Sequence, residues 1–134
     1  MIFGPDELLE LVAHHAARLG IPIPVDRSMM CSVVAEAERL AGGRVEEEPA
    51  ALFYACARRA GALGKVGRTF FDDIAVAQAD AIGLVLRATE LDLVLLRGRI
   101  AFGVAGWDDV RGAFTEWLSP PDQTPKRTTP KRPR

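Results

Sequence analysis

The stretch PAALFYACARRAGALGKVGRTFF, residues 49–71, joins two apolar helical runs through a segment with three glycines. Pro49 is tolerated in the first turn of a helix, and the inward-facing positions after it recur at helical spacing (Leu52, Phe53, Cys56 and Ala60). The following run, residues 69–88, is apolar on almost every side, which is typical of the buried centre of a small helical domain. The sequence therefore predicts a helical protein built around residues 69–88.

Helix signals flank this centre on both sides. Pro5 and Gly20 bracket a first helix, and the pair Gly42–Gly43 ends a second one that begins near Ser28. Thr89 and Asp92 have the spacing of a capping box for a helix that ends at Gly106. The same run could instead form two short strands that turn at residues 97–98. We favour the helix, because no further strand is available to complete a sheet.

The last helix is expected over residues 107–118, with Trp107 and Trp117 anchoring it in the core. From Ser119 the composition turns to Pro, Thr, Lys and Arg, which cannot form a core. The fold class is therefore all-α, a single compact bundle of about six helices over residues 1–118. A disordered basic tail is expected over residues 119–134.

Charge and composition exclude several classes of protein. The last sixteen residues carry five basic groups and one acid, whereas residues 1–118 are mildly acidic. An acidic body argues against a binder of duplex DNA, so nucleic acid is expected to be contacted only weakly, through the tail, if that tail is more than a solvated terminus. Neither a membrane span nor a signal peptide is evident, which favours a cytoplasmic protein. Cys31 and Cys56 are expected to be reduced core thiols, and no metal site is predicted.

The glycine-rich segment is a candidate phosphate site. It lacks the spacing of a nucleoside-triphosphate P-loop, and a helix rather than a strand precedes it. Backbone N–H groups at the start of a helix nevertheless attract phosphate, and glycine lets the phosphate approach closely. Arginine and lysine side chains add charge. The predicted phosphate-binding residues are Gly64, Lys65, Gly67, Arg68 and Thr69.

Three stretches resemble the Fic/Doc family, named for filamentation induced by cAMP and death on curing. They are VDRSMMCSVVAEAERL (residues 25–40), PAALFYACARRAGALGKVGRTFF, and VAGWDDVRGAFTEWL (residues 104–118). The resemblance covers most of residues 6–118. It implies a Fic/Doc-like fold and the toxin component of a toxin–antitoxin module. The cofactor that it implies is ATP or another nucleoside triphosphate with Mg²⁺.

The family's catalytic motif is degenerate in this chain. Ala60 stands at the position of the motif's histidine and Gly64 at that of its acid, while Gly67 and Arg68 match its last pair. Alanine cannot act as a general base, and glycine cannot hold a metal ion. No catalytic residue is therefore assigned. The partners implied are a small antitoxin protein and a translation factor or other protein target.

Two alternatives stay open beside this resemblance. The chain could be a non-enzymatic helical adaptor or regulator that binds a protein partner, since no complete catalytic constellation is present. The resemblance could also be accidental, because small helices rich in Ala, Leu and Val resemble one another. Asp72 and Asp73 are interpreted as first-turn acids that stabilise the central helix, with metal binding as the less favoured reading. His14 is expected to be exposed and His15 half-buried.

Overall fold

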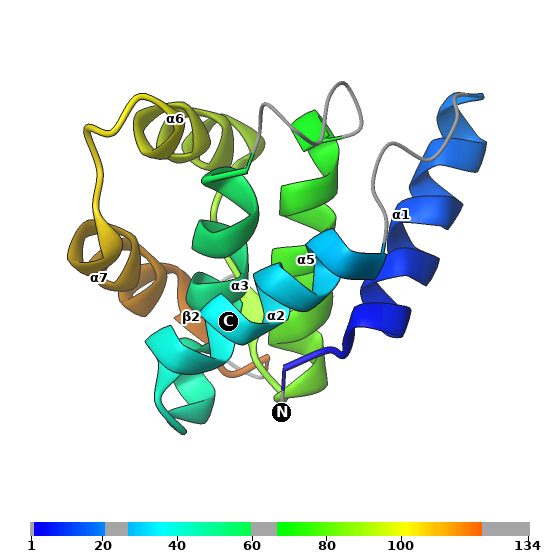
Figure 1. Ribbon diagram of the computed structural model, residues 1–134. Coiled ribbons are helices and arrows are strands. Elements are labelled where there is room, and N and C mark those ends of the chain that lie inside the picture. The colour runs from blue at the N-terminus through cyan, green and yellow to red at the C-terminus, as the bar shows by residue number, and fades with distance from the viewer. Residues whose placement is uncertain (1, 21–26, 60–66, 122–134) are drawn as a thin grey trace, which may run out of the picture.

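The computed structural model describes residues 2–20, 27–59 and 67–121. Within these ranges the chain is helical, with one short antiparallel pair of strands (Figure 1). The α-helices are α1 (Pro5–Leu19), α2 (Arg27–Ala41), α3 (Glu48–Ala57), α5 (Gly67–Ala81), α6 (Glu90–Ala101) and α7 (Trp107–Trp117). A 3₁₀ turn η1 (Val45–Glu47) and the strands β1 (Val85–Leu86) and β2 (Leu118–Ser119) complete the described elements. The prediction of an all-α bundle of about six helices is confirmed.

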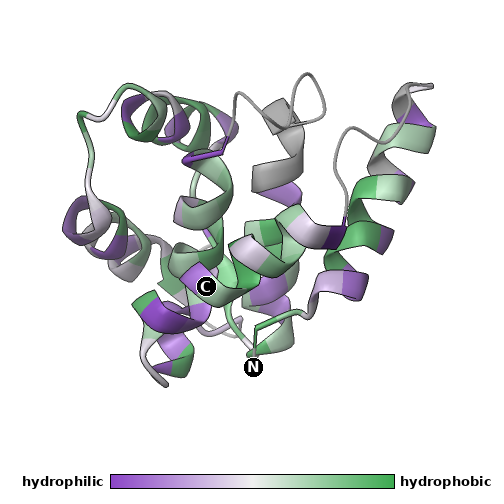
Figure 2. Cartoon of the chain, viewed as in Figure 1, coloured by the Kyte–Doolittle hydropathy of each residue, from purple (hydrophilic) through white to green (hydrophobic). Residues whose placement is uncertain are grey.

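Helix α3 is the centre of the bundle. It packs against α2, α5, α6 and α7, and each of its residues except Tyr54 is buried. Alanine occupies four of its ten positions, which lets neighbouring helices approach closely. Figure 2 shows this mainly hydrophobic helix among others whose ribbons carry both hydrophilic and hydrophobic residues.

The expectation that residues 69–88 form the buried central helix is wrong. Helix α5 ends at Ala81, and Gly83 follows with a φ of 79°, a left-handed conformation that favours glycine. Only one face of α5 is buried, around Ile74, Ala75 and Gln78, whereas Val76 is exposed on another face. The apolar residues after the helix serve a different purpose, because they lead into β1.

Strands β1 and β2 form a ribbon that the sequence did not predict. Val85 pairs with Ser119 and Leu86 with Leu118. The Arg87 side chain donates hydrogen bonds to the Ser119 hydroxyl and to the Pro120 carbonyl. Ser119 therefore belongs to the folded body, so the predicted boundary of the tail is too early. Residues 122–134 lie outside the described residues.

The run after Thr89 is helical, as expected. The Asp92 N–H donates to the Thr89 hydroxyl, and the Thr89 N–H donates to the Asp92 carboxylate, each at 3.0 Å, so the predicted capping box forms. The helix ends at Ala101 rather than at Gly106, and Gly103 turns the chain with a φ of 76°. The turn then leads directly into α7.

Aromatic contacts attach α7 to α3. The rings of Phe53 and Phe114 lie 5.3 Å apart between centroids, and the rings of Tyr54 and Trp107 lie 5.9 Å apart. Trp117 packs against Phe114. Both tryptophans contact the core while staying partly exposed. The predicted anchoring role of the two tryptophans is confirmed.

The two thiols are free, as predicted, but they differ in burial. Cys56 is buried in α3, whereas Cys31 is only half-buried on α2, where Arg27 approaches its sulfur at 3.7 Å. Cys31 is therefore not a core thiol, because it lies at the edge of the buried face of α2. No helix in the described ranges is both long enough and apolar enough to span a membrane.

Candidate functional site

The predicted phosphate site lies only partly within the described residues. Gly64 and Lys65, together with Ala60 at the position of the motif's histidine, lie outside them. Helix α5 begins at Gly67, two residues before the expected start, so the backbones of Gly67, Arg68 and Thr69 form its first turn. Of this site the structure describes that backbone alone, and the side chains of residues 67–71 lie outside the described part.

The first turn of α5 lies at the same end of the bundle as the last turn of α3. The two helices pack side by side and run in opposite directions (Figure 1). The N-terminal end of a helix carries partial positive charge from its unpaired N–H groups. Basic side chains at the end of α3 would therefore add to an anion-attracting region at this edge.

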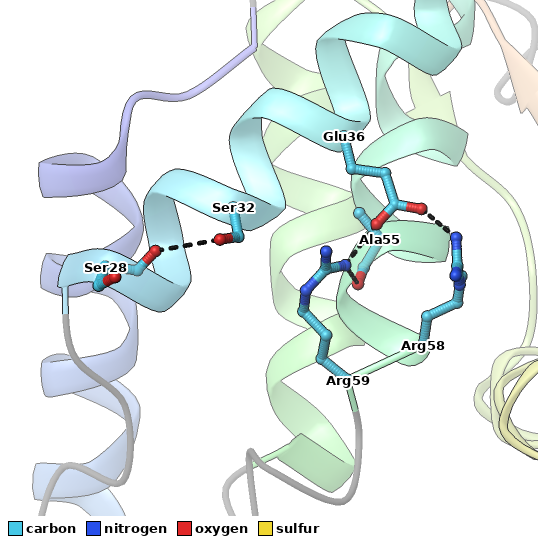
Figure 3. A network of polar contacts seen from close by, with 6 residues as sticks. All are labelled: Ser28, Ser32, Glu36, Ala55, Arg58 and Arg59. Atoms are coloured by element: carbon cyan, nitrogen blue, oxygen red, sulfur yellow. Dashed lines mark hydrogen bonds and ion pairs between the residues drawn. The ribbon is translucent and has the colours of Figure 1, made fainter.

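Such side chains are present immediately after α3. Arg58 and Arg59 both donate to the carboxylate of Glu36 on α2, one to each oxygen (Figure 3). The Glu36 side chain is only 5% exposed, whereas those of Arg58 and Arg59 are 51% and 28% exposed. The guanidinium of Arg59 also donates to the Ala55 carbonyl at 2.8 Å. One buried acid thus anchors two arginines whose remaining N–H groups face outward.

The pair of arginines is also fixed by packing. The Arg58 guanidinium carbon lies 5.6 Å from the centroid of the Tyr54 ring, within the range of a cation–π contact. Tyr54 in turn contacts Trp107 of α7. Arg58 is therefore held from two sides, by a carboxylate and by an aromatic face.

These side chains border an open groove between α2 and the end of α3. Its volume is about 540 Å³, and it is lined by Ser32, Ala35, Glu36, Arg39, Arg58 and Arg59. Three guanidinium groups and one carboxylate give the groove an excess of positive charge. Planar guanidinium groups bind phosphate and carboxylate through paired hydrogen bonds. The arrangement is suited to binding an anion rather than to proton transfer.

Sequence reasoning missed Glu36, Arg39, Arg58 and Arg59. A signal was present in α2, where Glu36 lies among the apolar positions that face the core. A carboxylate on an apolar face is rarely left unpaired. Its partners could not be identified from spacing, since Arg58 and Arg59 follow more than twenty residues later.

Asp72 and Asp73 do not occupy the first turn of α5, contrary to expectation, because the helix starts at Gly67. Asp72 accepts a hydrogen bond of 2.8 Å from Arg97 of α6. Burial raises the pKa of the Asp72 carboxyl, and Arg97 opposes this effect. Within the described part of the chain, no group of three His, Cys, Asp or Glu side chains could hold a metal ion. Asp72 therefore serves to join α5 and α6.

His14 is not among the residues that line the groove. His14 is exposed on α1, as predicted, in a shallow depression that also includes Phe3, Glu7, Glu10 and Leu11. The side chain of His15 lies outside the described part of the chain.

A second cavity lies on another side of the bundle. It has a volume of about 170 Å³ and is bordered by η1, α7 and β2. Phe114, Leu84 and Leu118 contribute apolar surface to it, and one oxygen of Glu47 is buried there without a hydrogen-bond partner. The other oxygen of Glu47 accepts from Arg44 at 2.9 Å.

No family model, curated protein or solved structure matches the chain. The Fic/Doc resemblance stays a prediction made from the three sequence stretches.

Proposed function

We propose that this protein is a Fic/Doc-like component of a toxin–antitoxin module, in which the nucleotidyl- or phosphoryl-transfer motif is degenerate and phosphate binding is retained. The phosphate ligand is that of ATP or another nucleoside triphosphate. The proposed site is the segment Gly64–Thr69, with Arg58 and Arg59 at its border. A small antitoxin protein is the proposed partner, and a translation factor or other protein is the proposed target.

One observation carries this proposal. The α3–α5 pair brings the N-terminal end of a 15-residue helix to the same edge as two arginines anchored by a buried carboxylate. Backbone N–H groups and guanidinium groups can bind phosphate without the histidine and acid that the motif has lost. The arrangement therefore supports phosphate binding. For transfer of a nucleotidyl or phosphoryl group, no general base is assigned among the described residues.

Titration calorimetry of ATP with Mg²⁺ tests the phosphate site. We expect saturable binding to the wild type and at least tenfold weaker binding to Arg68→Glu. The matched control is Arg111→Glu on α7, where the arginine pairs with the exposed carboxylate of Asp108. Binding that is equally strong in all three proteins would contradict the assignment to Gly64–Thr69.

A biological readout tests the toxin assignment separately. Expression of the wild type in a bacterial host should slow growth, and co-expression of a small protein encoded by a neighbouring gene should relieve the effect. If the protein neither affects growth nor binds such a neighbour-encoded partner, the toxin–antitoxin assignment fails, whatever the result with ATP.

The second candidate function is a non-enzymatic adaptor or regulator. The open basic groove favours it, since Arg39, Arg58 and Arg59 could equally bind carboxylates of an acidic protein segment. A poly-glutamate peptide is a suitable probe. Binding of this peptide that Arg39→Glu abolishes, combined with no binding of ATP, would favour the adaptor over the nucleotide-binding toxin.

A further inference from the structure

Exposed apolar side chains concentrate on one part of the described surface. Of the seven large hydrophobic residues that are well exposed in the described ranges, five lie on α6 or in the turn after it. We call them the α6 stripe, and they are Leu91, Val94, Leu95, Phe102 and Val104. Phe102 is 86% exposed, which is unusual for a residue of its size. In Figure 2 hydrophobic residues appear on α6 and on the turn at this edge of the molecule.

The stripe follows the helical repeat and faces away from the core. Leu91, Leu95 and Phe102 are separated by four and seven residues, so they lie along one side of the helix. The opposite side carries the buried residues Leu93, Leu96 and Ile100. Helix α6 is therefore apolar on two opposite faces, and the core covers only one of them. Such a face indicates a surface that binds another protein.

A glycine leaves space within this stripe. Gly98 lies two turns after Leu91 on the same side of α6, and a Cβ atom built on it would meet no atom within 4 Å. Glycine in a helix interior costs about 1 kcal/mol relative to alanine. The open position at Gly98 provides room for a large side chain from a facing helix.

Charges beside the stripe are arranged so that α6 complements itself. Glu90 and Asp92 lie in the first turn of the helix, and Arg99 lies in the last turn. If two copies of α6 pack in opposite directions, the acidic end of each faces the basic end of the other. In a pair centred on Leu95, Asp92 of one copy lies within one residue of the level of Arg99 of the other, and Leu91 lies within one residue of the level of Gly98. A parallel arrangement would instead place like charges together.

The C-terminal segment, residues 122–134, is unsuited to packing against the α6 stripe. Residues 122–134 contain proline but no other apolar side chain, and five of them are Lys or Arg. We propose that a second copy of this chain covers the α6 stripe, forming an antiparallel helix pair with a two-fold axis near Leu95. A helix of twelve residues is only about 18 Å long, so the interface is smaller than that of a tight dimer. We expect a dissociation constant of about 10 to 100 μM.

Analytical ultracentrifugation of the full chain between about 5 and 500 μM tests this proposal. The wild type should shift from monomer to dimer, and Leu95→Lys should weaken the dimer by about 30-fold or more. Val76→Lys is the matched control, since Val76 is an exposed valine on α5, outside the stripe. Its dimer should equal that of the wild type. Circular dichroism is the control that checks whether each variant stays folded.

Charge reversal tests the orientation of the pair. Arg99→Glu should weaken the dimer by about threefold, because the substituted side chain faces the acidic end of the other copy. Arg111→Glu on α7 should leave it unchanged. An Arg99→Glu dimer as strong as the wild type would contradict the proposed pairing of charges.

Disulfide formation tests the register. In a Cys31→Ser background, Leu95→Cys should oxidise to a covalent dimer, because two residues beside the axis lie close enough for a disulfide. Leu91→Cys should not, because its two copies are separated by about eight residues along the helices, or about 12 Å. Preferential cross-linking through Leu91→Cys would overturn the antiparallel arrangement. A chain that stays monomeric over the whole range, or whose α6 stripe binds a different protein while it is monomeric, would overturn the proposal.

Discussion

Replacement of Glu36 by glutamine tests how the basic groove is held together. Among the described residues that line the groove, Glu36 is the one acid, and its two oxygens accept charged hydrogen bonds from Arg58 and Arg59. Glutamine has nearly the same shape but only one acceptor oxygen and no charge. The substitution therefore removes one of the two bonds and leaves two arginines close together without a neutralising charge.

The magnitude follows from burial. A hydrogen bond that involves a charged group contributes about 1.5 to 3 kcal/mol, and loss of one partner of a fully buried ion pair costs about 3 to 5 kcal/mol. The arginines here are partly exposed, so water compensates part of the loss. We expect Glu36→Gln to lower the free energy of unfolding by about 2 kcal/mol, with a fall in Tm of about 8 °C for a chain of this size.

The same substitution should improve anion binding. With the carboxylate gone, all three arginines of the groove face an anion without competition, so inorganic pyrophosphate should bind about threefold more tightly at 0.1 M salt. Stability is measured by urea denaturation and binding by calorimetry. Glu38→Gln is the control, because Glu38 is an exposed acid on the same helix. A loss of stability no greater than that of the control, or weaker anion binding, would refute the anchoring role of Glu36.

Further predictions concern the thiols, a buried carboxyl and a buried amide. Burial raises the pKa of the Cys56 thiol to about 12, so a disulfide reagent at neutral pH should modify Cys31 in the folded protein and Cys56 only after unfolding. The pKa of the Asp72 carboxyl is raised above 3.8. The folded state therefore binds the carboxyl proton more tightly than the unfolded chain does. As the pH rises and this proton is lost, the contribution of Asp72 to stability decreases. The wild type's free energy of unfolding minus that of Asp72→Asn should therefore fall as the pH rises above about 4; a difference that rises with pH would contradict the assignment. Gln78 is fully buried and donates to Glu48 at 3.3 Å, so Gln78→Ala should cost about 2 to 3 kcal/mol in urea denaturation.

Local signals predicted much of the helical fold. Pro5 and Gly20 bracket α1, and the Thr89–Asp92 capping box starts α6. These signals act within three or four residues, so they can be recognised without knowledge of the tertiary structure. The choice of a helix over two strands after Thr89 is also confirmed, although it rested on the lack of a further strand to complete a sheet.

The errors occurred where distant residues decide the outcome. The two-residue strand β1 is too short to show an alternating pattern, and it exists because β2 pairs with it more than thirty residues later. The apolar run of residues 69–88 predicts burial, but it does not show where the helix ends and the following strand begins. Burial of α3 on almost every side likewise depends on the packing of four other helices.

The same distinction applies to the candidate site. Gly67 and Arg68 stay predicted phosphate-binding residues, chosen because they are adjacent in the sequence and match a motif. Glu36 and Arg58 were not chosen, since α2 and α3 bring them together across 22 residues. The sequence signal for such an ion pair is an acid at a buried helical position without a local partner. This signal indicates that the acid has a partner, but it does not identify which residue the partner is.

The burial of α3 limits where this protein can bind a ligand. Since nine of the ten residues of α3 are buried, polar side chains beside this helix are open to solvent at its C-terminal end, where Arg58 and Arg59 leave the core. Helix α5 contributes its first turn at that same edge, and Asp72, one turn further along α5, is fixed to α6 by Arg97. The α6 stripe lies opposite the buried residues of α6, and none of its residues lines the groove. If a second copy binds at the stripe as proposed, the groove's own lining residues stay outside that contact, so we expect anion binding and self-association to be independent.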